Sequence, residues 1–230
     1  MPLPVVFVPG LLCTGALFAD QILGLGGTRG VHIGDVTRHE NVSEMAAHVL
    51  ASAPPCFDLV GLSMGGYVSF EILRQAPDRV DKLVLMDTSA RADSTDQAKR
   101  RAELIDQSSF GTFKGVTPRL LPLLIHKSRL DDESVTSVVL QMAADVGQAG
   151  FVRQQRALLA RPDSRGDLKG ITQNTLIIVG DEDAITPPKL AREMAELLPD
   201  ARLEIVPTCG HLAPLEQPDI TTDLLLDFLD

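Results

Sequence analysis

The sequence predicts an α/β fold, in which a doubly wound, mostly parallel β-sheet is interrupted by a helical insertion. Short apolar runs alternate with helical patterns along most of the 230 residues. The runs are continuously apolar, which is typical of strands covered on both faces, as in a parallel sheet. The order strand, helix, strand favours right-handed crossovers that place helices on both faces. The length fits one large domain.

The first part of the chain, residues 1–90, alternates expected strands with expected helices. We expect helices at 44–51, capped by Ser43, and at 65–75. Pro77 closes the second helix, because proline disfavours helical geometry in the residue before it. The expected strands are 4–8, 31–33, 58–61 and 82–86.

The last part, residues 169–230, continues the same alternation. Apolar runs at 175–179 and 202–206 predict two more strands, and residues 221–229 predict a final helix. Together with residues 1–90 they form the predicted core of the fold.

Residues 91–168 break the alternation, because they contain no clear strand pattern. Apolar residues recur at helical spacing within 132–146, while 119–125, which Pro122 interrupts, and 151–160 are also helix-like. Ordinary crossover helices are the alternative, but a single crossover needs far fewer residues. The sequence therefore predicts a helical cap over the strand ends.

Composition excludes several classes of function. Asp plus Glu number 31 against 21 Lys plus Arg, for a formal charge of −10. This balance argues against binding nucleic acid or anionic lipid.

No apolar run approaches the ~20 residues that span a bilayer, and the start of the chain lacks a basic region with a cleavage site. We expect a cytoplasmic monomer or homodimer that binds a small molecule.

The three cysteines, Cys13, Cys56 and Cys209, are widely spaced and form no zinc or CxxC pattern. They are expected to be reduced thiols. Cys13 and Cys209 lie close to segments with candidate catalytic residues.

The strongest chemical signal is Gly61-Leu62-Ser63-Met64-Gly65. It follows an expected strand and precedes an amphipathic helix, which is the context that a G-x-S-x-G nucleophile turn needs. Glycine on either side of the serine removes side chains that would clash in so tight a turn. The alternative is a glycine-rich turn with an incidental serine. We expect Ser63 to be a nucleophile.

A serine hydroxyl needs an adjacent base, because it is a weak nucleophile at neutral pH. Of five histidines, His211 follows the last strand and would reach the same sheet edge as Ser63. Asp181, Glu182 and Asp183 compete as the acid that orients it. His32 and His39, with acidic neighbours, match no metal-ligand spacing.

With these residues the chain resembles the α/β-hydrolase superfamily over nearly its whole length, most closely its capped esterases, haloperoxidase-like members and C–C hydrolases. The segment from Gly180 to Pro187 is similar to the family's acid segment, and this resemblance assigns Asp183 as the triad acid. Gly210-His211 resembles its histidine segment. Residues 1–10 correspond to the family's third strand, so its usual first hairpin is absent.

The resemblance also implies two backbone N–H donors for an oxyanion. One belongs to Met64, and the other follows Pro9-Gly10, which replaces the usual His-Gly, and is assigned to Leu11. Asp87, after a core strand, is a rival acid because some members place theirs there. Unlike the residues around Asp183, those that flank Asp87 do not match the family's acid segment.

We expect a serine hydrolase that forms an acyl-serine on a small, apolar carboxylic ester, without metal or organic cofactor. Leu12 and Tyr67 are expected to contact the substrate beside Met64. The same triad supports a perhydrolase, a C–C bond hydrolase or a lyase. A non-catalytic ligand receptor on this scaffold is the alternative from another class.

Overall fold

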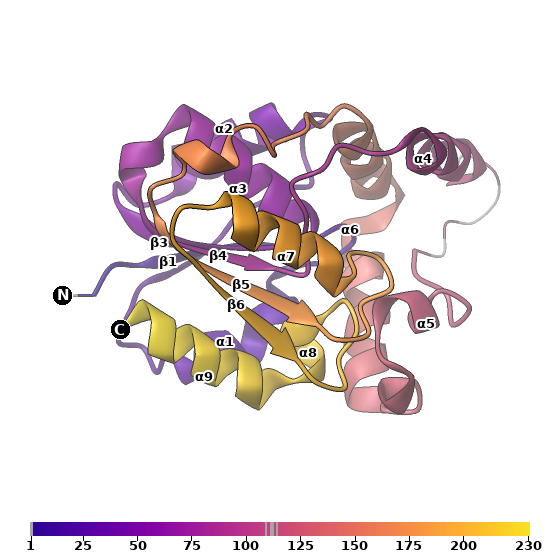
Figure 1. Cartoon of the computed structure of the whole chain (residues 1–230). Coiled ribbons are helices and arrows are strands. Elements are labelled where there is room, and N and C mark those ends of the chain that lie inside the picture. Colours follow the sequence, from indigo (N-terminus) through magenta and orange to yellow (C-terminus); the bar gives the residue numbers. More distant parts are fainter. Residues whose placement is uncertain (1, 109, 111–112, 114) are drawn as a thin grey trace.

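A six-stranded sheet lies between two layers of helices in the computed structural model, which describes residues 2–108, 110, 113 and 115–230 (Figure 1). The strand order is β2-β1-β3-β4-β5-β6, and every neighbouring pair is parallel. The predicted doubly wound parallel sheet is confirmed. The strands are β1 (Val5–Val8), β2 (Val31–Ile33), β3 (Phe57–Leu62), β4 (Val80–Met86), β5 (Asn174–Gly180) and β6 (Ala201–Val206).

Helices cover both faces of this sheet. One face carries α2 (Val42–Ser52), α3 (Met64–Gln75) and α7 (Pro188–Leu197). The other carries α1 (Ala19–Gly24), α8 (Ala213–Glu216) and α9 (Pro218–Leu229). Short 3₁₀ turns lie at Gly15–Phe18, Pro77–Arg79, Lys127–Arg129 and Leu168–Gly170.

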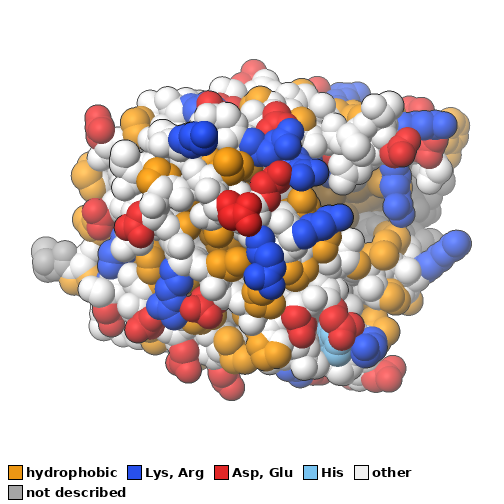
Figure 2. Space-filling model, viewed as in Figure 1, with side chains coloured by type: hydrophobic (Ala, Val, Ile, Leu, Met, Phe, Trp, Pro, Cys, Tyr) orange, Lys and Arg blue, Asp and Glu red, His pale blue; other side chains and the backbone are white. Residues whose placement is uncertain are grey.

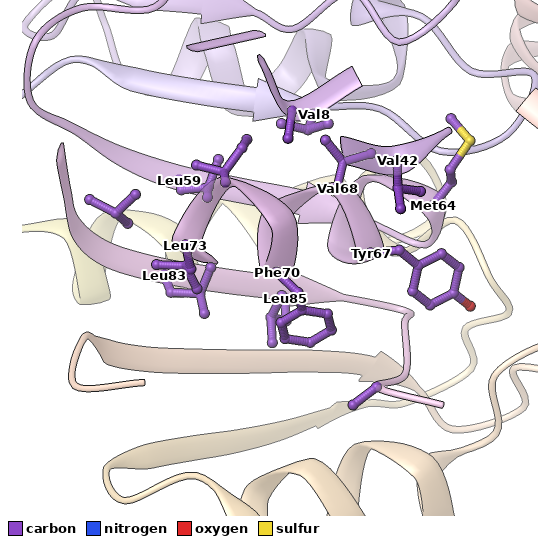
Figure 3. Packing of buried hydrophobic residues seen from close by; sticks show 14 of the residues in the cluster. Val8, Val42, Leu59, Met64, Tyr67, Val68, Phe70, Leu73, Leu83 and Leu85 are labelled. Atoms are coloured by element: carbon purple, nitrogen blue, oxygen red, sulfur yellow. The ribbon is translucent and has the colours of Figure 1, made fainter. Parts of the chain in front are cut away.

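Each central strand contributes to two hydrophobic cores, because successive side chains point to opposite faces. Leu59 and Leu83 belong to the core under α2, α3 and α7. Val60 and Val84 belong to the core on the other face. Figure 3 shows α3 side chains packed over Leu59 and Leu83. All four strand residues are fully buried, which explains why β3 and β4 are continuously apolar around these positions.

Between β4 and β5 the described residues contain helices and no strand. The helices are α4 (Thr95–Ser108), α5 (Leu121–Leu124) and α6 (Glu133–Leu159). They lie beyond the carboxyl ends of the strands, at one end of the sheet (Figure 1). The helical character expected of residues 91–168 is present. The division of the chain into a core and a cap at residues 90 and 169 stays a prediction.

Several elements differ from the expectations. The cap of α2 is Asn41, not Ser43: its side-chain oxygen accepts the N–H of Glu44 at 2.7 Å. The last helix begins at Pro218, since proline is well tolerated in a first turn. The two helices expected at 132–146 and 151–160 are both present as the two segments of α6, which meet at a kink where Gly147 has a non-helical backbone (φ 65°, ψ 177°).

Four helices lie where the sequence analysis expected none: α1, α4, α7 and α8. Only Ser108 of α4 is buried among its described side chains, so this helix has no apolar stripe to predict it.

By length and composition α6 is also the one described helix that could cross a membrane. Gly147 divides it into two segments that are each shorter than the ~20 residues a span needs. Val139, Met142 and Phe151 of this helix pack into the second core. These contacts are those of a helix inside a folded domain.

Candidate active site

Ser63 occupies the turn between β3 and α3, with φ 53° and ψ −112°. Such a backbone is strained for a residue other than glycine. A Cβ atom on Gly61 would lie 2.6 Å from the carbonyl oxygen of Gly65. One on Gly65 would lie 2.7 Å from the carbonyl carbon of Val8. Both glycines are therefore required where the sequence motif has them, and the turn holds the serine at the carboxyl end of the sheet.

His211 lies in the loop after β6 and faces Ser63. Its Nε2 is 2.9 Å from Ser63 Oγ, and its Nδ1 is 2.8 Å from Asp183 Oδ2. A carboxylate only accepts hydrogen bonds, so Nδ1 donates to Asp183 and Nε2 is left to accept the Ser63 hydroxyl. The structure thus brings together the three side chains proposed as a triad, from the loops after β3, β5 and β6.

Asp183 is held by its own loop. Its Oδ1 accepts the backbone N–H of Ile185 at 2.8 Å and of Thr186 at 2.9 Å. The Thr186 hydroxyl donates to Oδ2 at 2.8 Å and lies 3.3 Å from His211 Nδ1. An Asp side chain often accepts the backbone N–H two residues on, so the contact with Ile185 is a local turn feature, whereas the contact from the Thr186 hydroxyl was not expected from the sequence.

The surroundings of His211 and Asp183 stabilise the imidazolium–carboxylate pair that forms when His211 takes a proton. Burial opposes the imidazolium, but the Asp183 carboxylate outweighs it and raises the pKa of His211. Burial likewise opposes the carboxylate of Asp183, but His211 and the hydrogen bonds from Thr186 lower its pKa. The loop amides thus favour an ionised acid beside a basic imidazole.

The rival acids contact groups other than His211. Asp181 accepts the N–H of Cys209 at 3.0 Å, and exposed Glu182 contacts Lys127 Nζ at 3.2 Å. Asp87 is fully buried, and burial and nearby Asp183 raise its pKa well above the ordinary value. No hydrogen bond joins any of these three carboxylates to His211 within the described residues.

Asp87 and Glu216 instead fasten the loops of the site. Asp87 accepts the backbone N–H of Gly180 at 2.9 Å and of Ala213 at 3.1 Å, which joins the acid loop to the histidine loop. Glu216 accepts the N–H groups of Gly210 and Leu212 at 3.0 Å, on either side of His211. Both acceptors act on backbone amides, so sequence patterns do not reveal their partners.

Two backbone N–H groups, those of Met64 and Leu11, are the expected oxyanion donors. Met64 is the first residue of α3, and its amide has no helical acceptor. The Leu11 amide has no hydrogen-bond acceptor among the described residues. Both residues line the same cavity as Ser63, as expected of oxyanion donors. The backbone N–H of the next residue, Leu12, already donates a hydrogen bond to another residue.

The Leu12 amide donates to Gln154 Oε1 at 3.1 Å. Gln154 belongs to α6, is fully buried, and donates through Nε2 to the carbonyl of Val36 at 3.3 Å. Leu12 itself has a positive φ of 59°. A side chain 142 positions away thus holds the loop that carries Leu11, a contact that no local sequence pattern indicates.

The site opens into a cavity of about 410 Å³ between the sheet edge and the inserted helices. Leu12 and Tyr67, the expected substrate contacts, both line it. Figure 2 shows a hollow on this side of the molecule, between α4 and α5. The wall is mainly apolar, formed by residues such as Leu11, Met64, Leu104, Val116, Leu124, Val139, Met142, Phe151 and Ile185.

Cys13 also lines the cavity, but burial raises the pKa of its thiol to about 12. Burial raises the pKa of the Cys209 thiol as well. Neither thiol is a thiolate near neutral pH, so neither competes with Ser63 as a nucleophile.

The other histidines lie away from Ser63. His32 is 3.1 Å from the Ser52 hydroxyl, and the rings of His39 and His48 are tilted against each other with centroids 5.2 Å apart. His126 contacts Glu182 at 3.2 Å. The described residues contain no group of three or more His, Cys, Asp or Glu side chains placed to hold a metal ion.

Comparison with known proteins identifies the family of this chain. The family model described as the alpha/beta hydrolase fold matches residues 51–218. BpoC of Mycobacterium tuberculosis, whose name carries a provisional assignment as a non-heme bromoperoxidase, is 30% identical over 174 residues, 74% of this chain and 66% of that protein. The pimeloyl-[acyl-carrier protein] methyl ester esterase of Nitrosospira multiformis is 28% identical over 76% of this chain and 69% of its own length.

Among solved structures, a thermophilic esterase from Thermogutta terrifontis superposes with a TM-score of 0.86 and 28% identity. That superposition covers 99% of this chain and 89% of the esterase. With a parallel sheet, a serine turn after β3 and a family match over most of its length, the chain belongs to the α/β-hydrolase fold family.

Proposed function

We propose that this protein is a serine hydrolase that cleaves small, apolar carboxylic esters through an acyl-serine intermediate. The observation that carries the proposal is the hydrogen-bonded series Ser63–His211–Asp183, with contacts of 2.9 and 2.8 Å, at the base of an apolar cavity. A nucleophile, its base and an orienting acid in this geometry are what acyl transfer needs.

In the first half-reaction, His211 Nε2 takes the hydroxyl proton as Ser63 Oγ attacks the ester carbonyl. The N–H groups of Leu11 and Met64 receive the negative oxygen that develops. His211 then gives its proton to the departing alcohol. In the second half, His211 activates water against the acyl-serine, and the carboxylic acid leaves. Asp183 stays ionised throughout and stabilises the imidazolium.

Two of the relatives support an ester as the substrate, since both are esterases by name. The apolar lining of the cavity supports a hydrophobic acyl or alcohol part. The perhydrolase, C–C hydrolase and lyase alternatives use the same three side chains, so the choice between them depends on turnover measurements.

A fluorophosphonate probe tests the proposal directly. We expect a mass increase on Ser63 that is absent from Ser63→Ala. A folded wild-type protein that stays unlabelled would support the ligand-receptor alternative instead.

A panel of 4-nitrophenyl esters of increasing chain length, with β-diketone and peroxide controls, then tests the reaction. We expect the esters to be turned over fastest, and faster turnover of a diketone would replace the ester assignment.

A reducing, cytoplasmic location is part of the same proposal. Cys13, Cys56 and Cys209 are all free thiols, and Cys13 and Cys209 are buried. Fractionation of cells that express the full chain, followed by thiol labelling under denaturing conditions, would test it.

A further inference from the structure

The cavity wall is positively charged, although the protein as a whole is acidic. Two consecutive arginines of α4, Arg100 and Arg101, line the cavity, and no Asp or Glu does so among the described residues. The chain carries 31 acidic against 21 basic side chains. Figure 2 shows Lys and Arg side chains beside the hollow between α4 and α5. This wall therefore has the opposite sign of charge to the rest of the molecule.

Arg101 is fixed in place. Its Nε donates to Asp93 Oδ2 at 2.6 Å, and its Nη1 donates to Gln155 Oε1 at 2.8 Å. The other oxygen of Asp93 is 2.8 Å from Arg161 Nη1, and the Arg161 guanidinium lies 4.3 Å above the ring of Tyr67. Arg161 and Asp93 side chains are 4% and 3% exposed.

One buried carboxylate is thus shared by two guanidinium groups. Asp93 neutralises one unit of charge, so Arg101 and Arg161 together leave one positive charge behind the cavity wall. Charges in such a partly enclosed, apolar setting are less screened than those on an open surface. An anion in the cavity would be attracted to this wall.

Arg100 adds a second positive charge at the opening. It is exposed, and no ion pair or hydrogen bond with another residue engages it in the described part of the chain. A guanidinium group binds a carboxylate through two parallel N–H···O contacts. Arg100 is therefore free to receive a carboxylate that enters above the apolar wall.

We propose that the cavity takes esters whose acyl chain ends in a free carboxylate, with Arg100 as the residue that receives this carboxylate. The inference rests on the proposed esterase function and names its substrate class. The apolar wall contacts the methylene chain, and Ser63 attacks the ester carbonyl at the other end. The alcohol leaves with the proton from His211, water releases the dicarboxylate, and the terminal carboxylate itself does not react.

The test compares two esters of the same shape: the mono-4-nitrophenyl ester of suberic acid and the analogue in which a neutral amide replaces the carboxylate. We expect wild-type kcat/KM to favour the carboxylate by about tenfold at low salt, mainly through KM, and less as salt is added. Arg100→Gln should lower this ratio at least fivefold.

Lys99→Gln is the matched control, because Lys99 is exposed on the same helix, lies outside the cavity and carries the same charge. It should leave the ratio unchanged. Equal turnover of the two esters, or equal loss of preference in both variants, would overturn the inference while the esterase proposal stands. Failure of both esters together with failure of the fluorophosphonate probe would overturn the proposed function itself.

Discussion

Two buried carboxylates, Asp183 and Asp87, lie within reach of the same loops but contact different groups. Asp183 bonds the imidazole of His211 at 2.8 Å, whereas Asp87 bonds two backbone amides. Replacing each of them by asparagine should therefore distinguish the carboxylate that orients His211 from the one that holds the loops together.

Asp183→Asn should lower kcat by about 10³–10⁴-fold, because the amide no longer holds His211 in the tautomer that accepts the serine proton. Asp87→Asn keeps one acceptor and should mainly reduce the free energy of unfolding, by about 1–3 kcal/mol. Active-site titration, ester kinetics and urea unfolding of both variants check this. The reverse pattern of kcat losses would reassign the acid.

The pH dependence follows from His211. Asp183 raises its pKa above the ordinary value of about 6.5 despite burial, and the base works only when neutral. Wild-type kcat/KM should therefore rise with pH through a midpoint above about 6.5. In Asp183→Asn the residual activity should have its midpoint at lower pH, since burial then acts without the carboxylate. A midpoint that does not move would contradict this account.

At the scale of elements, the inserted helix α6 reaches back to the loop after β1. Gln154 contacts the Leu12 amide at 3.1 Å and the Val36 carbonyl at 3.3 Å. These contacts hold the loop that carries the Leu11 amide, so Gln154 is expected to act as a positioning residue.

Gln154→Leu should lower kcat by about 10–100-fold per titrated active site with little change in KM, because an oxyanion donor acts mainly in the transition state. Gln154→Glu, which keeps an acceptor for the Leu12 amide, should recover part of the loss. Gln141→Leu, at an exposed position of α6, serves as the control. If KM rises and kcat holds, the side chain shapes the cavity instead.

At the scale of the whole molecule, two hydrophobic cores on opposite faces of one sheet hold the strand ends together. Leu59 of β3 is fully buried in one core, and the same strand leads directly to Ser63. Leu59→Ala should reduce the free energy of unfolding by about 2–5 kcal/mol.

The surface change Leu23→Ala, at a position that is 78% exposed, should alter stability by no more than about 0.5 kcal/mol. Chemical denaturation of both variants measures the difference. If both substitutions change the free energy of unfolding equally little, the packing of Leu59 into this core does not stabilise the sheet.

The sequence could predict much of this molecule because its signals are local. A continuously apolar strand is recognisable wherever both faces of a sheet are covered, and β1, β3, β4 and β5 have such runs. The edge strand β6 instead alternates polar and apolar residues. The turn around Ser63 is equally local, since only glycine fits at Gly61 and Gly65. In contrast, α4 packs through few buried side chains, so its polar sequence predicts no helix.

By itself the sequence determined the α/β fold, the serine turn and the nearness of His211 to it, because the ends of parallel strands meet at one sheet edge. The residues alone left three acids open beside His211, and the family resemblance assigned Asp183, which the structure places 2.8 Å from His211 Nδ1. Only the tertiary structure showed that Asp87, Glu216 and Gln154 fasten loops. It also brought Arg100 and Arg101 to the cavity wall. The physical reason is that hydrogen bonds to backbone amides and charges facing a cavity join segments far apart in the chain, and leave no periodic pattern along it.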